Sequence, residues 1–465
     1  MIVWAYLTVC MMLGFFKVPK MKSLKDYAIG PTQFSTAALG LSMIAANICP
    51  SDTLGVSEKS FSLGMVFVVT AFLQAIRWWL MGRIIAPSLK FLQFNGCITL
   101  VDIMKLLYGK WGKYICTANI IFCIAILSIY YKASALILEK YLNIPFLYGA
   151  ALITVAIAIY SIFGGIHAII ITDVVQFFIF VTVIPAIFFF GFQNIDIPAT
   201  WNNIPYEKTH ILTSDIPLLL SFCIYTIIPV TGFPYIQRAL MAKHGNQLQK
   251  IFSMTGVFSA FFILMMGIIG LFVSGMNPEI QSDDALFFFI DQVVPSSIMG
   301  FVAISFLAII MSTASSFLNA STVVIIKDII TPAFPKLNNN KAQMFLTKFA
   351  GVIVAFSAFG IMFVKDHIMD MLWTLDNFWD PFVSVPLIMG LIGVRIKPEN
   401  FKYVLMSALA GVLISRAFHG EFDTITLVFG VISSISAMLF FRDKSIKKHD
   451  VVNEIQLQDM QKAVA

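Results

Sequence analysis

The sequence predicts an all-α polytopic membrane protein, and its composition and its apolar runs are the two observations behind that prediction. Of the 465 residues, 59% are hydrophobic and only 12% are charged. The mean hydropathy is +0.87. A soluble domain has about a quarter of its residues charged, so this composition excludes one. The apolar residues also gather in runs of about 20, the length that a helix needs to cross a bilayer.

About 13 apolar runs are long enough to be transmembrane helices. The run that starts at Met1 lacks the charged start and the small-residue cleavage site of a signal peptide, so we interpret it as a span. The expected spans are 1–16, 35–57, 62–80, 113–138, 146–163, 168–193, 213–237, 250–275, 290–325, 343–364, 369–393, 402–418 and 422–441. We therefore expect a single transmembrane domain over 1–441 and a short polar tail over 442–465.

Lys and Arg predict the orientation, because loops rich in them stay in the cytoplasm. Most of them fall in alternate segments of the chain, namely 17–29, 81–113, 238–250, 326–348, 395–402 and 442–465. The N-terminus should therefore lie outside and the C-terminus in the cytoplasm, in a multi-pass protein of the cell inner membrane. The formal net charge of +6 comes from these loops and indicates no nucleic-acid partner. The lipid bilayer is the expected surrounding.

Two expected spans are interrupted by polar and helix-breaking residues. "ALGLSMIAANICPSDTLG" (38–55) carries Pro50 in its middle, and "YTIIPVTGFPYIQR" (225–238) carries Pro229 and Pro234. Backbone that leaves helical geometry inside a membrane is tolerated only where it lines a cavity or is buried in protein. Two such spans, five apart, are typical of inverted-repeat transporters. The alternative is a pair of proline kinks that serve packing alone.

The ninth span, "AIIMSTASSFLNAS" (308–321), carries a polar stripe. Its members, which share one helix face, are Ser305, Ser312, Ser315, Ser316 and Asn319. Hydroxyls beside freed carbonyls offer hard oxygen ligands of the kind that Na⁺ takes at broken helices. Small residues also let membrane helices approach closely, and their hydroxyls can bond their own backbone. The pattern alone leaves both interpretations open.

Four motifs in order, "SMIAANICPSDTLGVS", "FGGIHAIIITDVVQ", "FPYIQRALMAK" and "IIMSTASSFLNASTVVIIKDI", together resemble the sodium:solute symporter family. The resemblance extends over nearly the whole chain. It implies the leucine-transporter-type inverted-repeat fold, with 5+5 core helices at roughly 35–393, one helix before them and two after.

The resemblance also implies a sodium site between spans two and nine. Its ligands would be the backbone carbonyls of Ala45, Ile48 and Ile309 and the hydroxyls of Ser312 and Thr313. Ile309 departs from the small residue usual in the family, which is tolerable because only its carbonyl would bind.

Some family members have a second sodium site nearer the cytoplasm, and Asp173, Ser315 and Ser316 match its positions. A carboxylate inside a span is costly enough to suggest a function. Asp173 could instead be an interfacial carboxylate that reaches water, or a proton carrier.

The resemblance places the solute at the bilayer midplane, beside the two breaks. The lining candidates are Asn47, Cys49, Asp52, Gln74, Tyr225 and Ile228. Ala71 and Ile228 replace the acidic residue and the aromatic gate of the sugar carriers, which disfavours glucose-like solutes. Asp52 could meet an ammonium group or could be a hydrated residue of the outer vestibule. Asp376 and Asp380 are expected near that vestibule, where a gating role is a hypothesis.

Together these features predict a sodium-coupled symporter that imports a small organic solute by alternating access and acts as a monomer. The solute would be an amino acid, an organic acid or a vitamin-like compound, and Na⁺ the coupling ion. The alternatives are a proton-coupled symporter of the same fold and a transporter-like solute sensor. An enzyme is disfavoured, because the sequence has no nucleotide-binding loop, nucleophile–base constellation or metal cluster.

Overall fold

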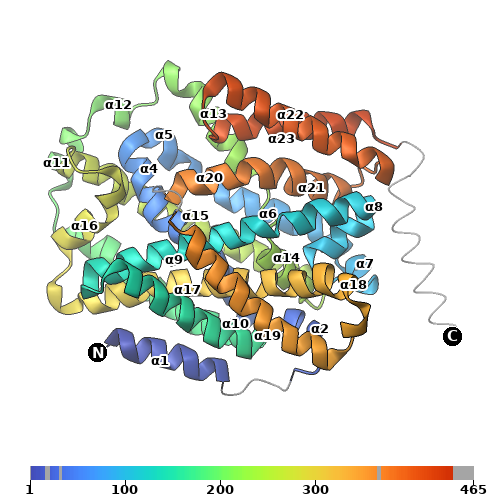
Figure 1. Cartoon of the computed structure of the whole chain (residues 1–465). Coiled ribbons are helices and arrows are strands. Elements are labelled where there is room, and N and C mark those ends of the chain that lie inside the picture. Colours follow the sequence, from blue (N-terminus) through green and yellow to red (C-terminus); the bar gives the residue numbers. More distant parts are fainter. Residues whose placement is uncertain (1, 16–20, 31–33, 364–367, 444–465) are drawn as a thin grey trace.

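The computed structural model describes residues 2–15, 21–30, 34–363 and 368–443 and is almost entirely helical (Figure 1). In the described part, β-type pairing is limited to an isolated bridge between Ile396 and Arg442. Helices satisfy their backbone hydrogen bonds internally, as a chain must do where its backbone is surrounded by lipid. The all-α prediction is therefore confirmed.

The helices of the first half of the chain include both members of the first broken span. They are α1 (Ile2–Phe15), α2 (Leu24–Ile29), α3 (Thr36–Asn47), α4 (Val56–Leu63), α5 (Met65–Val68), α6 (Leu73–Ile85), α7 (Leu89–Phe94), α8 (Leu100–Ala118), α9 (Ile120–Leu142) and α10 (Phe146–Gln193). A π-helical turn, Ser51–Gly55, precedes α4. Gly165, with φ of 53°, breaks α10 into two helices, which correspond to the predicted spans 146–163 and 168–193.

The second half continues with α11 (Ile197–Asn203), α12 (Tyr206–Thr209), α13 (Ile216–Ile227), α14 (Phe233–Leu240), α15 (Gly245–Met276), α16 (Ala285–Val293), α17 (Met299–Val324), α18 (Thr331–Ala333), α19 (Asn340–Ile361), α20 (Ile368–Trp379), α21 (Val385–Leu391), α22 (Phe401–His419) and α23 (Thr424–Phe440). A π-helical turn, Asp380–Ser384, joins α20 to α21.

Seven helical segments of the described chain are long and apolar enough to cross a membrane, and shorter apolar helices accompany them. The membrane-protein class is thus supported, whereas the count of 13 spans stays a prediction. Some helical segments extend beyond the expected spans: the third span was expected over 62–80, and its helical segment runs over Met65–Phe94. Arg83, beyond the expected end of that span, is an exposed residue in the last turn of α6.

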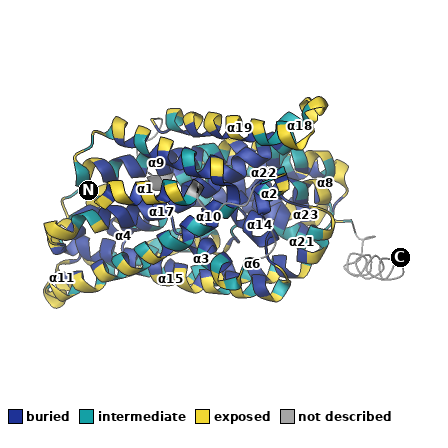
Figure 2. Cartoon of the chain, turned by 90° about the horizontal axis from the view of Figure 1, so that it is seen from below, coloured by how far each residue is buried: buried dark blue, intermediate teal, exposed yellow. Residues whose placement is uncertain are grey.

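Helix α17 forms the centre of the bundle. Every residue from Val302 to Val324 is buried, and the helix packs against α3, α9, α10, α14 and α19. The small side chains of its serine stripe permit this close packing. Figure 2 shows buried residues at the centre and exposed ones on outer helices such as α19, whose exposed side chains include Phe345 and Phe349.

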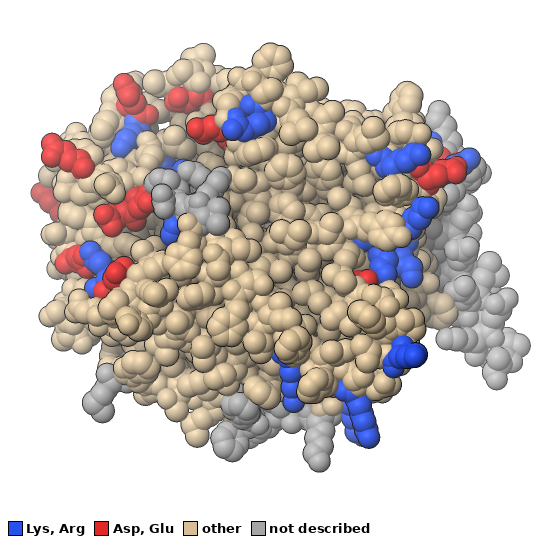
Figure 3. Space-filling model, viewed as in Figure 1, with Lys and Arg blue, Asp and Glu red and all other residues tan. Residues whose placement is uncertain are grey.

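Charged side chains gather at opposite ends of the bundle. In Figure 3 acidic residues cluster at the left end, with some basic ones among them, whereas the charged side chains at the right end are mainly basic. The start of α1 lies at the first end and the end of α23 at the second (Figure 1). This polarity is what the predicted orientation requires. Most of the predicted tail, 444–465, lies outside the described residues.

Candidate ion and solute sites

The first broken span frees backbone carbonyls at the middle of the bundle. Helix α3 ends at Asn47, and Ile48 is extended, with φ of −69° and ψ of 119°. Pro50 has no N–H, so the carbonyl of Ala46 has no helical partner there. The hydroxyl of Tyr235 donates to that carbonyl at 3.4 Å instead. The carbonyls at the end of α3 are therefore available to groups outside the helix.

The five predicted sodium ligands lie together between α3 and α17. The Ser312 hydroxyl donates to the carbonyl oxygens of Ala45 and Ile309, each at 2.8 Å. The Thr313 hydroxyl lies 3.1 Å from the carbonyl oxygens of Ile48 and Ile309. All five residues are buried. The atoms required for the site thus come from two helices that are far apart in sequence.

This cluster consists of neutral oxygens, three carbonyls and two hydroxyls. Carbonyls and hydroxyls suit hard cations, and unwound carbonyls coordinate Na⁺ in inverted-repeat transporters. No group of three or more His, Cys, Asp or Glu side chains that could hold a metal occurs among the described residues. The donor set therefore fits Na⁺ as transported cargo and does not resemble a transition-metal site.

Asp173 lies in a buried ion pair that the sequence did not reveal. Its Oδ2 accepts hydrogen bonds from Arg238 Nη2 at 2.8 Å and from the Ser42 hydroxyl at 2.5 Å. The same Nη2 lies 2.7 Å from Ser316 Oγ, and the Ser315 hydroxyl donates to the Ser312 carbonyl. The carboxylate and the guanidinium are both fully buried.

The buried pair changes the interpretation of the second ion site. The sequence placed Arg238 at the start of a cytoplasmic segment, whereas α14 carries it into the core beside α3, α10 and α17. Asp173 is therefore no interfacial carboxylate. Its second oxygen, Oδ1, is buried without a hydrogen-bond partner among the described residues. A second Na⁺ would have to share this carboxylate with Arg238, so the two-ion hypothesis stays a proposal.

The second broken span leaves its helix at Ile228 and resumes at Phe233. Between them, the Thr231 hydroxyl lies 2.5 Å from Ser384 Oγ and accepts a hydrogen bond from Trp379 Nε1 at 3.1 Å. These bonds hold the break against α20 and the π-helical turn that follows it. The two breaks thus face a common space.

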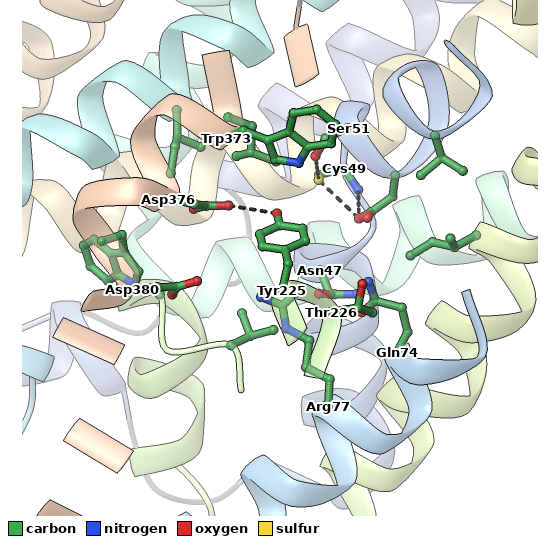
Figure 4. A pocket seen from close by; sticks show the side chains of 18 of the residues that line it. Asn47, Cys49, Ser51, Gln74, Arg77, Tyr225, Thr226, Trp373, Asp376 and Asp380 are labelled. Carbon is green, nitrogen blue, oxygen red and sulfur yellow. Dashed lines mark hydrogen bonds between the residues drawn. The ribbon is translucent and has the colours of Figure 1, made fainter. Parts of the chain in front are cut away.

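A cavity of about 150 Å³ lies between the two breaks. Of the predicted solute residues, five line it, and most are labelled in Figure 4: Asn47, Cys49, Asp52, Gln74 and Tyr225. Ile228 does not line it, because its side chain packs in an apolar cluster with Val385, Leu427 and Val431. A break fixes where the backbone opens but not the direction of each side chain, which is why the sequence misplaced this residue.

Asp52 has a local role that the sequence left open. Its Oδ2 accepts the backbone N–H of Cys49 and the Cys49 thiol, each at 3.2 Å. Asn47 donates to Ser259 Oγ at 2.7 Å and ties α3 to α15. Both side chains stabilise the broken segment as well as lining the cavity.

Three charged residues that were absent from the predicted lining also reach the cavity: Arg77, Asp376 and Asp380. The Tyr225 hydroxyl donates to Asp376 Oδ2 at 2.8 Å (Figure 4). Asp376 and Asp380 were expected near the outer vestibule and Arg77 was not considered. The sequence did offer one sign that Arg77 could be functional, because an arginine inside a membrane span is unusual.

Comparisons with known proteins identify the family. The family model described as "Sodium:solute symporter family" matches residues 27–411. The chain belongs to the sodium:solute symporter family.

The curated relatives have low sequence identity to the chain, but the matches extend over most of its length. The chain is 24% identical over 351 residues to a sodium/glucose cotransporter of Vibrio parahaemolyticus, in a match that covers 66% of this chain and 63% of that protein. It is 21% identical over 386 residues to a sodium/pantothenate symporter of Haemophilus influenzae, with 78% of each covered. A high-affinity proline transporter of Bacillus subtilis is 21% identical over 373 residues, with 77% and 79% covered.

Solved structures share the fold. A Na⁺-coupled sialic acid symporter in a substrate-bound outward-open state aligns with a TM-score of 0.79 at 17% identity, covering 94% of this chain and 96% of that one. MhsT in complex with L-phenylalanine aligns with a TM-score of 0.56 at 13% identity, covering 88% and 98%. The predicted leucine-transporter-type fold is confirmed.

Proposed function

We propose that the chain is a sodium-coupled symporter that imports a small organic solute by alternating access. The observation that supports it most is the cluster of five buried oxygens between α3 and α17, next to a cavity at the two breaks. Ala45, Ile48, Ile309, Ser312 and Thr313 would hold the Na⁺. The curated relatives named as sodium symporters agree with this coupling ion.

Coupling would follow from the position of the ion. A Na⁺ held by α3 and α17 favours the conformation in which these helices lie together, and that conformation also shapes the cavity. By linkage, Na⁺ then raises the affinity for solute, and solute raises that for Na⁺ by the same factor. A membrane potential of about 100 mV adds roughly 2.3 kcal/mol for each charge moved inward.

Within the same proposal, the chain is a monomeric transporter, not an enzyme, in the cell inner membrane. Residues 1–441 form one transporter domain, with the N-terminus outside and the C-terminus in the cytoplasm. Proton coupling is the second candidate, and the unpartnered Oδ1 of Asp173 is the observation that favours it.

Uptake by proteoliposomes tests the proposal. The purified chain would be reconstituted and offered labelled amino acids, organic acids and vitamins under an inward Na⁺ gradient, a K⁺ gradient, or a pH gradient without Na⁺. We expect at least one solute to accumulate under the Na⁺ gradient alone. Accumulation under the pH gradient without Na⁺ would support the second candidate, and binding without accumulation would support a sensor.

A further inference from the structure

The cavity contains charges of both signs that the protein leaves incompletely paired. Arg77 Nε is buried without a hydrogen-bond partner, and no ion pair joins Arg77 to a carboxylate of the described residues. Its guanidinium lies 5.7 Å from the centre of the Tyr225 ring. The Arg77 side chain is only partly buried, so its guanidinium can reach the cavity. A charged residue inside a membrane span, with a buried N–H that lacks a partner, suggests that a ligand completes the site.

The opposite sign comes from another wall. Asp380 is 3% exposed, and its Oδ1 accepts a hydrogen bond from Ser384 at 2.6 Å. Its Oδ2 is buried without a partner among the described residues. Figure 4 shows Arg77 entering from α6, whereas Asp376 and Asp380 enter from the side of α20.

Asp52 differs from Asp380, because its Oδ2 accepts two hydrogen bonds from Cys49 and neither of its oxygens is buried without a partner. Asp376 already accepts the Tyr225 hydroxyl. Among the charged residues that line the cavity, Arg77 Nε and Asp380 Oδ2 are thus the two atoms that are buried without a hydrogen-bond partner in the described part of the chain.

From this arrangement, and resting on the proposed function, we infer that the transported solute is an amino-acid-type zwitterion. Its carboxylate pairs with Arg77 and its ammonium group with Asp380, with Asp376 adding negative charge nearby. Aromatic residues of the cavity, including Tyr130, Phe317 and Trp379, would surround the apolar part of the solute.

Other charge classes leave the cavity uncompensated. A monocarboxylate would leave Asp380 unpaired, a simple amine would leave Arg77 unpaired, and an uncharged sugar would leave both. A site built to bond a charged group rejects an analogue that lacks it, because the buried partner is then unsatisfied. Selection among solutes should therefore depend on two charges rather than on size alone.

Binding to the purified full-length protein tests the inference without a known ligand. The standard L-amino acids would be screened in NaCl by their effect on the thermal unfolding midpoint. Two analogues of the best binder would then be screened: the amine that lacks its carboxylate, and the carboxylic acid that lacks its amino group. We expect an amino acid to stabilise the protein and each analogue to need at least about tenfold higher concentration, as loss of a charged hydrogen bond predicts.

Two variants locate the charges on the protein. Arg77→Gln should weaken amino-acid binding at least about tenfold and remove the preference over the amine. Asp380→Asn should also weaken amino-acid binding at least about tenfold, and it should remove the preference for the amino acid over the carboxylic acid. Arg83→Gln is the matched control, because Arg83 is on the same helix and does not line the cavity. Its guanidinium carbon lies 5.0 Å from the centre of the Trp79 ring. The control variant should bind like the wild type.

The possible failures are distinguishable. If no amino acid binds, or if an analogue with one charge binds equally well to the wild type, the inference is wrong. Na⁺-driven uptake of a sugar would also overturn it while leaving sodium symport intact. Amino-acid binding with the expected charge preference, but without any dependence on Na⁺, would support the inference and contradict the proposed coupling. If a variant does not fold, the analogue comparison on the wild type decides alone.

Discussion

Replacing Asp173 by Asn tests the buried ion pair that, with Ser42 and Ser316, joins four helices in the core of the bundle. The change removes one charge and little volume, and it leaves the Arg238 guanidinium fully buried. Removing one partner of a buried pair costs about 3–5 kcal/mol, because the remaining charge is uncompensated. Arg238 keeps hydrogen bonds with Ser42 at 2.9 Å and Ser316 at 2.7 Å, so we expect the lower end, about 3 kcal/mol.

A double-mutant cycle separates this pair from general disruption. Asp173→Asn combined with Arg238→Gln removes both charges. The loss of unfolding free energy in this double variant should therefore be at least about 1 kcal/mol smaller than the sum of the losses in the two single variants. The measurement is the free energy of unfolding of each variant in the same detergent. A single Asp173→Asn variant as stable as the wild type, or strictly additive effects, would refute the proposed pairing energy.

Three further predictions concern topology, packing and ion number. A cysteine introduced by Asn246→Cys should react with impermeant maleimide only after the membrane is opened, whereas a cysteine introduced by Asn277→Cys should react in intact cells. The reverse pattern would contradict the predicted orientation, with the N-terminus outside. Gly270→Ala should lower the unfolding temperature, because a Cβ there would lie 2.2 Å from the Ser57 carbonyl oxygen; an unchanged temperature would argue against this contact. If Asp173 helps to hold a second Na⁺, Asp173→Asn should reduce the Hill coefficient for Na⁺ from near two towards one, whereas a wild-type coefficient of one excludes that site.

The sequence alone predicted the parts of the fold that depend on local chemistry. Pro50 and Pro229 cannot donate a backbone hydrogen bond, so the two breaks could be located from residue type. The sodium ligands were placed by resemblance to a family, and the structure brings Ala45 and Ile48 next to Ser312 and Thr313. Three of these proposed ligands would act through backbone carbonyls, so their position depends little on side-chain identity.

The remaining features depend on how the helices are rotated against one another. Nothing in the sequence places Arg238 opposite Asp173, since the two lie on different helices. Arg77 lies inside the expected third span, 62–80, but the sequence does not show that its side chain faces the cavity. Ile228 was placed in the cavity because it lies at a break, yet its side chain faces a separate apolar cluster.

The most direct test of sodium coupling is equilibrium binding of radioactive Na⁺ to the purified protein. The wild type should bind Na⁺ saturably, and Ser312→Ala and Thr313→Ala should each weaken binding about tenfold or more, since each removes one oxygen ligand at a cost of about 1.5 kcal/mol. Ser321→Ala is the control, because the Ser321 hydroxyl is on the same helix, is buried, and makes no hydrogen bond to α3. Saturable binding that is lost in the two site variants and kept in the control is the predicted result. Absence of saturable binding by the wild type, or equal binding by all four proteins, would contradict the proposed site.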